Sequence, residues 1–112
     1  MIKRGDVFFA NLPGSEGNVQ GFKSRPWVVV QNDIGNEHSP VTIVVPMTTK
    51  MKQQIPTHVN LVWGPIYGTV MCEQIRVVDK EEFEVVTHLP NEIMTHVDRA
   101  LAIAIGLKRN DE

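Results

Sequence analysis

The chain has 112 residues and a formal net charge of −2, with 42% hydrophobic and 21% charged residues. This length suits one small domain, and the composition is typical of a folded soluble protein, not of a disordered tail. The longest largely apolar run, 100–107, is too short to span a bilayer, and the first residues lack the apolar stretch of a secretory signal. The single cysteine, Cys72, excludes an internal disulfide. We therefore expect one cytoplasmic domain over residues 1–112, with no membrane partner.

The charge is unevenly distributed along the chain. Residues 1–78 hold seven Lys and Arg against five Asp and Glu, whereas residues 79–112 hold four against eight. The net charge argues weakly against binding nucleic acid through charge alone, but any basic surface belongs to the first two thirds. Scattered solvating charges would give the same count.

The first half of the chain predicts three strands. The run Val7–Ala10 is the first, and it is followed by a long polar, glycine-rich loop from Leu12 to Ser24. Trp27–Val30 and Val41–Val45 are β-branched apolar runs, which indicates buried strands. The polar segment between them, Asn32–Pro40, is predicted as a turn region.

A second polar loop, Thr48–Pro56, leads into a partly alternating strand, His58–Trp63. The glycines of Gly64-Pro65 and Gly68 are predicted to bracket a turn. Thr69–Val78 is then expected to form one or two further strands. Because so small a domain buries limited apolar area, a second copy of the chain could add to it. Candidates for such an interface, or for packing within one copy, are Trp63, Ile66 and Tyr67.

The last third predicts one helical turn, one short strand and one strong helix. Asp79–Phe83 suits a helical turn with Asp79 as N-cap, and Glu84–His88 suits a strand. The strong helix begins near Pro90 and stops at Gly106. Its expected apolar stripe consists of Ile93, Val97, Leu101 and Ala104 or Ile105. Short strands followed by one amphipathic helix predict a mainly β, small barrel-like fold covered on one side.

Standard metal and hydrolase motifs are absent from the sequence. The histidines are far apart and no thiol has a partner, so no metal site and no cofactor are expected. Cys72 is expected to be a buried, inert thiol. No phosphate-binding Gly-rich loop and no nucleophile elbow occur. Glu73, Asp79 and Glu81 form no obvious acid–base pair.

Two loop ends remain as candidates for chemistry. Pro26 holds Arg25 in an extended backbone where the first loop meets a strand, and Thr48, Thr49 and Lys50 follow another strand directly. A guanidinium and a hydroxyl on rigid strand ends can grip a phosphodiester. Structural roles are the alternative, with Arg25 paired to a local acid and the threonines satisfying turn backbone groups. Taken alone, these residues favour the structural interpretation.

Several short motifs together resemble one known family. They are KRGDVFFA at 3–10, RP at 25–26, VVVQNDIGN at 28–36, VPMTT at 45–49, IPTHV at 55–59 and EQIRVVDK at 73–80. In this order and spacing they resemble the MazF/PemK (Kid-like) toxins of type II toxin–antitoxin systems. The resemblance covers nearly the whole chain, and the order of the motifs is highly specific.

The resemblance implies an SH3-like barrel of five to seven mostly antiparallel strands with one C-terminal helix, assembled as a homodimer. It implies an mRNA interferase that cuts single-stranded RNA at a short sequence without metal, and a cognate MazE-like antitoxin as partner. Arg25 matches the family's catalytic arginine and Thr48 its catalytic threonine. The implied reaction is attack of a ribose 2′-OH on the adjacent phosphate, leaving a 2′,3′-cyclic phosphate (or 3′-phosphate) and a 5′-OH.

An RNA-binding groove would draw on further polar side chains of the strands and loops. Candidates for phosphate contacts and base hydrogen bonds are Gln20, Lys23, Ser24, Thr49, Lys50, Lys52, Gln74 and Arg76. The chain departs from the family pattern before Arg25, because Gly14-Ser15-Glu16 stands further upstream than is common there. Glu16 is therefore not assigned to the site. The alternatives are a gyrase-poisoning toxin of the same fold, a non-catalytic binding module and an inactive relative. The presence of both Arg25 and Thr48 favours the nuclease.

Overall fold

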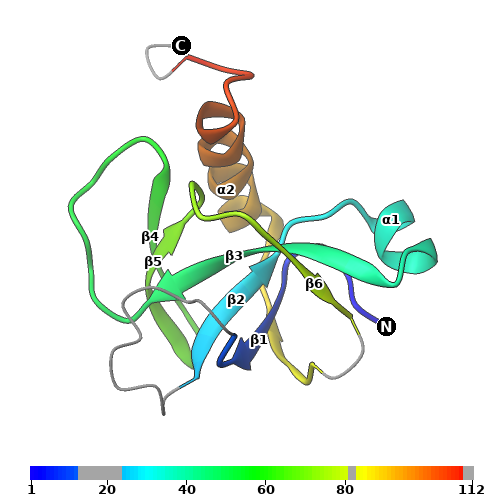
Figure 1. Cartoon of the computed structure of the whole chain (residues 1–112). Coiled ribbons are helices and arrows are strands. Elements are labelled where there is room, and N and C mark those ends of the chain that lie inside the picture. Colours follow the sequence, from blue (N-terminus) through cyan, green and yellow to red (C-terminus); the bar gives the residue numbers. More distant parts are fainter. Residues whose placement is uncertain (13–23, 81–82, 110–112) are drawn as a thin grey trace.

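The structure is a computed structural model that describes residues 1–12, 24–80 and 83–109. Within these ranges it contains seven strands and two helices (Figure 1). They are β1 (Asp6–Ala10), β2 (Arg25–Val29), α1 (Asp33–His38), β3 (Val41–Thr48), β4 (His58–Trp63), β5 (Ile66–Met71), β6 (Arg76–Asp79), β7 (Val85–His88) and α2 (Asn91–Ala104).

The strands form one antiparallel sheet in the order β4-β5-β3-β2-β1-β7, with β6 paired to β3 off this path. The long strand β3 is the centre of this arrangement. It pairs with β2 on one side, and on the other with β6 and then with β5. Because β3 serves two different neighbours along its length, the sheet curls into a half-barrel (Figure 1). The prediction of a mainly antiparallel, barrel-like fold with a C-terminal helix is confirmed.

Two hydrophobic cores lie on opposite faces of this sheet. Val28 of β2 and Val45 of β3 belong to the larger core, together with Val97 of α2. Side chains alternate along a strand, so the neighbours of these valines face the other way. The smaller core consists of Phe8, Trp27, Val29 and Val44. The run 27–30 is continuously apolar because both faces of β2 are covered.

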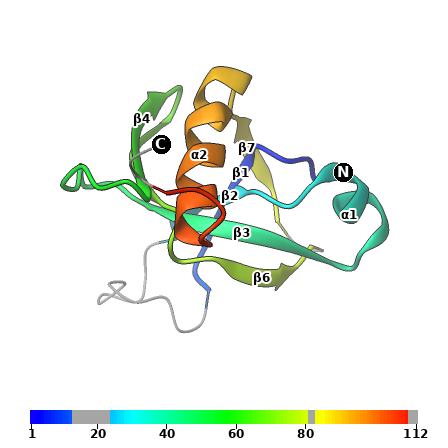
Figure 2. The ribbon, with the colours of Figure 1, turned by 90° about the horizontal axis from the view of Figure 1, so that it is seen from above.

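The helix α2 lies beside β4 and packs against the face of the larger core (Figure 2). It begins after Pro90 and stops before Gly106, whose φ of 82° suits glycine. The buried stripe is rotated from the predicted one, and Ile105 is 55% exposed beyond the end of the helix. The helix buries Met94, Val97 and Ala100, with Ile93 and Leu101 partly buried beside them. No helix in the described ranges is both long enough and apolar enough to cross a membrane.

The predicted turn region at 32–40 is wrong, because it contains the short helix α1. The Asn32 side chain caps it by accepting a hydrogen bond from the backbone amide of Gly35. Asn36 of this helix is buried and accepts a hydrogen bond from the hydroxyl of Thr42 on β3. A polar side chain therefore anchors α1, which explains why apolar periodicity did not reveal it.

Three smaller predictions concern single residues. The predicted role of Gly68 in a turn is wrong, because Gly68 lies inside β5 and the turn between β4 and β5 is formed by Gly64 and Pro65 alone. Asp79 is the last residue of β6, and residues 81–82 of the predicted helical turn lie outside the described ranges. Ile66 is only 1% exposed, so of its two predicted roles the structure supports packing within one copy.

Candidate functional site

Arg25 and Thr48 lie at adjoining ends of two paired strands. Arg25 begins β2 and Thr48 ends β3. These strands are antiparallel, and their pairing ends at Trp27 opposite Pro46, two residues from Arg25 on one strand and two from Thr48 on the other. Opposite residues of an antiparallel pair share one face of the sheet. Both side chains therefore belong to the face of Trp27, which is the face away from α2.

Thr48 begins a row of polar side chains across two more strands. It pairs with Thr69 of β5, and Thr69 pairs with Asn60 of β4. Thr48, Thr69 and Asn60 thus occupy one row over three neighbouring strands. The hydroxyl of Thr69 lies within hydrogen-bond distance of the Asn60 side-chain oxygen. Such a row needs a ligand or another chain segment to satisfy it, and at Thr69 that segment is the loop after β3.

The loop after β3 folds over Thr69, which is fully buried. The backbone amide of Lys52 donates to the Thr69 hydroxyl at 2.9 Å, and this hydroxyl lies 3.2 Å from the Lys50 carbonyl oxygen. The Lys50 amide in turn donates to the Thr48 hydroxyl at 3.3 Å. Thr49, Lys50 and Lys52 remain exposed. Their side chains are therefore available to a ligand beside Thr48, while the backbone of Lys50 and Lys52 is held in place.

Arg76 joins the same face from a third strand. It pairs with Val44 of the smaller core, and its guanidinium carbon lies 5.6 Å from the ring centroid of Trp27. This distance is that of a cation–π contact. The Trp27 indole nitrogen donates to the Ala10 carbonyl oxygen at 3.1 Å, which fixes the ring. Arg76 is therefore placed on the same face as Arg25 by a rigid aromatic platform.

The remaining predicted RNA-binding residues are less well grouped. Ser24 is exposed directly before Arg25, and Gln74 is exposed in the turn between β5 and β6. The Gln74 side-chain amide lies 3.7 Å from the sulfur of Met71. Gln20 and Lys23 lie outside the described residues, so the structure does not place them.

Burial shifts the pKa values of Arg25, a candidate reactive group, and of Cys72 in opposite directions. Partial burial lowers the pKa of the Arg25 guanidinium from its ordinary value. Burial, together with the charges of Glu73 and Asp98, raises the pKa of the Cys72 thiol to about 12. Cys72 is fully buried, so the prediction of a buried thiol is confirmed, and its raised pKa disfavours the reactive thiolate.

Two histidines lie within hydrogen-bond distance of a carboxylate. His58 Nε2 lies 3.1 Å from Glu73 Oε2, and His88 Nδ1 lies 2.7 Å from Asp6 Oδ1. Within the described ranges, no group of three or more His, Cys, Asp or Glu side chains could hold a metal ion. The pair of His58 and Glu73 lies beside the loop after β3. Sequence reasoning found no partner for Glu73, because the two residues are 15 positions apart and only strand pairing brings them together.

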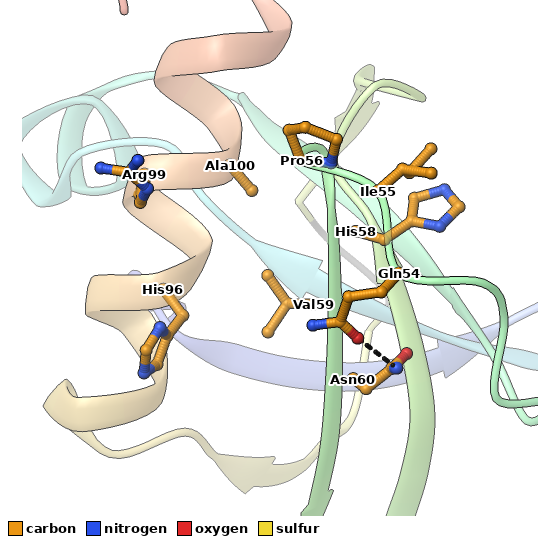
Figure 3. A pocket seen from close by; sticks show the side chains of 9 residues that line it. All are labelled: Gln54, Ile55, Pro56, His58, Val59, Asn60, His96, Arg99 and Ala100. Carbon is orange, nitrogen blue, oxygen red and sulfur yellow. Dashed lines mark hydrogen bonds between the residues drawn. The ribbon is translucent and has the colours of Figure 1, made fainter. Parts of the chain in front are cut away.

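A cavity of about 510 Å³ lies between α2 and the segment leading into β4 (Figure 3). His96 and Arg99 of α2 line one side, and Gln54 and Asn60 line the other, joined by a hydrogen bond of 3.0 Å. None of the residues predicted for catalysis or RNA binding lines this cavity.

The fold and the site together define a class of small protein, in which a curled antiparallel sheet presents an arginine and a threonine beside a basic loop. A model of the PemK-like, MazF-like toxins of type II toxin–antitoxin systems matches residues 3–105. The chain is also 43% identical to Endoribonuclease EndoA of Bacillus subtilis (strain 168), over 96% of this chain and 97% of that relative. The chain therefore belongs to the PemK/MazF toxin family, as the sequence motifs predicted.

Solved structures agree with this assignment. An endoribonuclease from a mycobacterial species, solved in complex with its cognate antitoxin, superposes with a TM-score of 0.82 at 27% identity, covering 96% of this chain and 98% of that one. A MazE–MazF complex from Deinococcus radiodurans gives a TM-score of 0.74 at 19% identity, covering 94% and 95%. At that identity the second match supports the fold alone.

Proposed function

We propose that the chain is an endoribonuclease toxin that cuts single-stranded RNA at a short sequence, without a metal ion. The observation that carries this proposal is the placement of Arg25 and Thr48 at adjoining strand ends on one face of the sheet. Family membership and the 43% identity to a named endoribonuclease support the same activity. A gyrase-directed or purely binding role has no comparable support in the site.

The proposed reaction uses the RNA's own nucleophile. The ribose 2′ oxygen bonds to the adjacent phosphorus and loses its proton, while the bond from phosphorus to the 5′ oxygen breaks and that oxygen gains a proton. The products are a 2′,3′-cyclic phosphate, which water can open to a 3′-phosphate, and a 5′-hydroxyl. DNA resists because it lacks the 2′-hydroxyl.

Arg25 and Thr48 divide the work in this reaction. The Arg25 guanidinium holds the phosphate in a bidentate contact and neutralises the charge that grows on its oxygens. Its lowered pKa changes in the direction that favours proton donation, but a guanidinium acts chiefly through its charge. The Thr48 hydroxyl orients the phosphate or the attacking 2′-hydroxyl, which is a contribution of position.

The RNA-binding surface in this proposal surrounds these two residues. Arg76 and the exposed Lys50 and Lys52 contribute positive charge, and Gln74 contributes an amide that can read an exposed base edge. We further propose that the toxin acts as a homodimer and that a cognate antitoxin neutralises it. An acidic antitoxin segment would compete with RNA for this surface.

The test is cleavage of a long single-stranded RNA in the presence of EDTA, followed by mapping of the product ends. We expect discrete cuts with 5′-hydroxyl ends, and a loss of about 10²–10³-fold in rate for Arg25→Ala. Arg99→Ala is the matched control, because this exposed arginine belongs to α2 on the other side of the sheet. A requirement for added magnesium, or full activity of Arg25→Ala, would contradict the proposed chemistry.

A further inference from the structure

Glu73 and His58 form a polar clasp between the loop after β3 and the turn after β5. Glu73 Oε2 lies 3.1 Å from His58 Nε2, and Glu73 Oε1 accepts a hydrogen bond of 2.9 Å from the Thr57 hydroxyl. On its other side, His58 Nδ1 lies 3.3 Å from the Gln53 carbonyl oxygen. The His58 side chain is 11% exposed, whereas that of Glu73 is 38% exposed. One carboxylate therefore holds a nearly buried ring, which in turn holds the loop backbone.

Glu73 is the hydrogen-bond acceptor of this clasp. A carboxylate only accepts hydrogen bonds, so the Thr57 hydroxyl and a ring N–H of His58 are its side-chain donors. Partial burial acts to raise the pKa of Glu73, but the opposing interactions are stronger. Hydrogen bonds from its own backbone amide, Thr57 and His58, together with the charge of His58, hold the pKa below its ordinary value. The ionised carboxylate is thus the form that the clasp stabilises.

The clasp joins the chain next to two residues that are proposed to bind RNA. Gln53 directly follows Lys52, and Glu73 directly precedes Gln74. Thr69 holds the Lys52 amide independently. These two contacts together fix the position of the loop after β3 (the basic loop) relative to the turn after β5, which carries Gln74 (the Gln74 turn). Without Glu73, the segment from Gln53 to Thr57 loses its side-chain contacts to the turn.

We propose that Glu73 and His58 are positioning residues for RNA binding, an inference that rests on the proposed function. They hold the basic loop and the Gln74 turn at the separation that a single RNA strand requires. This role predicts a change in RNA affinity opposite to the one that charge alone predicts. Glu73 is an acidic residue beside the proposed RNA surface, so simple charge repulsion predicts tighter RNA binding when it is removed. The clasp predicts weaker binding, because the loop is no longer ordered before RNA arrives.

The experiment compares Glu73→Ala with Glu37→Ala. Glu37 also stands beside a histidine, His38, but both side chains are largely exposed on α1. The two variants therefore remove the same charge with and without the clasp. The cleavage site is first mapped with wild-type protein, and an oligonucleotide bearing it, with a 2′-deoxy sugar at the scissile position, serves as the binding probe. Thr57→Val, which deletes one contact to Glu73 at constant size, is the second variant.

We expect Glu73→Ala to raise the Kd for this probe and the KM for cleavable RNA about tenfold, with kcat close to wild type and Tm lowered only slightly. Thr57→Val should show a smaller rise, and Glu37→Ala none. Unchanged or tighter binding by a folded Glu73→Ala protein would overturn the clasp, as would a loss confined to kcat. If Glu73→Ala does not fold, unchanged KM in Thr57→Val overturns it instead. Failure of the wild-type protein to cleave RNA would be a failure of the proposed function, which separates the two outcomes.

Discussion

A β-carbon on Gly68 would lie 1.8 Å from the carbonyl oxygen of Thr48, so the backbones of these two residues are in direct contact. Gly68 also has a φ of 135°, a conformation that other residues rarely adopt. Only glycine therefore allows β5 to approach the end of β3 this closely. The position of Thr48 depends on a residue that carries no side chain.

Substitution Gly68→Ala is expected to displace Thr48 and to reduce kcat about a hundredfold, because misplacement by about 1 Å has effects of that size. Overpacking should also lower the free energy of unfolding by about 3 kcal/mol. The control is Gly64→Ala, since Gly64 has a positive φ of 58° but open space around it. Urea unfolding and RNA cleavage rates check both effects. Wild-type kcat in Gly68→Ala would show that the contact does not position Thr48.

The hydroxyl of Thr48, more than its methyl group, is expected to matter for cleavage. Thr48→Val should lower kcat about a hundredfold, whereas Thr48→Ser should keep most of it, because serine retains the hydroxyl. The exposed Thr95 of α2, away from this face of the sheet, provides the control as Thr95→Val. Single-turnover cleavage measures the effect. Equal activity of Thr48→Val and Thr48→Ser would remove the hydroxyl from the mechanism.

Arg76 is expected to contribute affinity through one phosphate contact. Arg76→Ala should weaken RNA binding and reduce the slope of log affinity against log salt by about 0.7, the value for one contact to a single strand. Arg99→Ala, on the opposite face, should leave the slope unchanged. Binding titrations of wild type and both variants at several salt concentrations decide this. An unchanged slope in Arg76→Ala would assign Arg76 to packing on Trp27 alone.

Two carboxylates predict a loss of stability in acid. The Arg4 backbone amide, with smaller contributions from Asn36, Lys3 and Arg4 charge, holds the pKa of Asp33 below its ordinary value of 3.8. The pKa of Glu73 likewise lies below its ordinary value of 4.5.

Because both pKa values are lower in the folded state, the stabilisation is fully present above the ordinary values and is lost as the pH falls through the folded ones. The free energy of unfolding should therefore decline below about pH 4.5. The double variant Asp33→Asn, Glu73→Gln should decline less steeply in urea unfolding at pH 7, 5 and 3. An identical decline in wild type and variant would refute the assignment.

Much of the fold was predictable from local pattern. The apolar runs at 27–30 and 41–45 became β2 and β3, because a strand covered on both faces needs apolar side chains on both. The helix α2 followed from its caps and its apolar spacing, although the buried stripe was rotated by about one residue toward Met94. The helix α1 was missed because the buried amide of Asn36, not an apolar face, holds it.

The residues of the candidate site were predictable from sequence motifs, whereas the contacts that position them were not. The sequence alone, through its motifs, singled out Arg25 and Thr48 and the basic residues that follow Thr48. The tertiary structure alone decided that both strand ends share a face, that Gly68 admits Thr48, and that Thr69 and Glu73 hold the loop. These contacts join residues 15 to 17 positions apart in the case of Glu73 with His58 and Thr69 with Lys52. Such contacts depend on strand register and on the curl of the sheet, which are properties of the whole packed chain and leave no local signal in the order of residues.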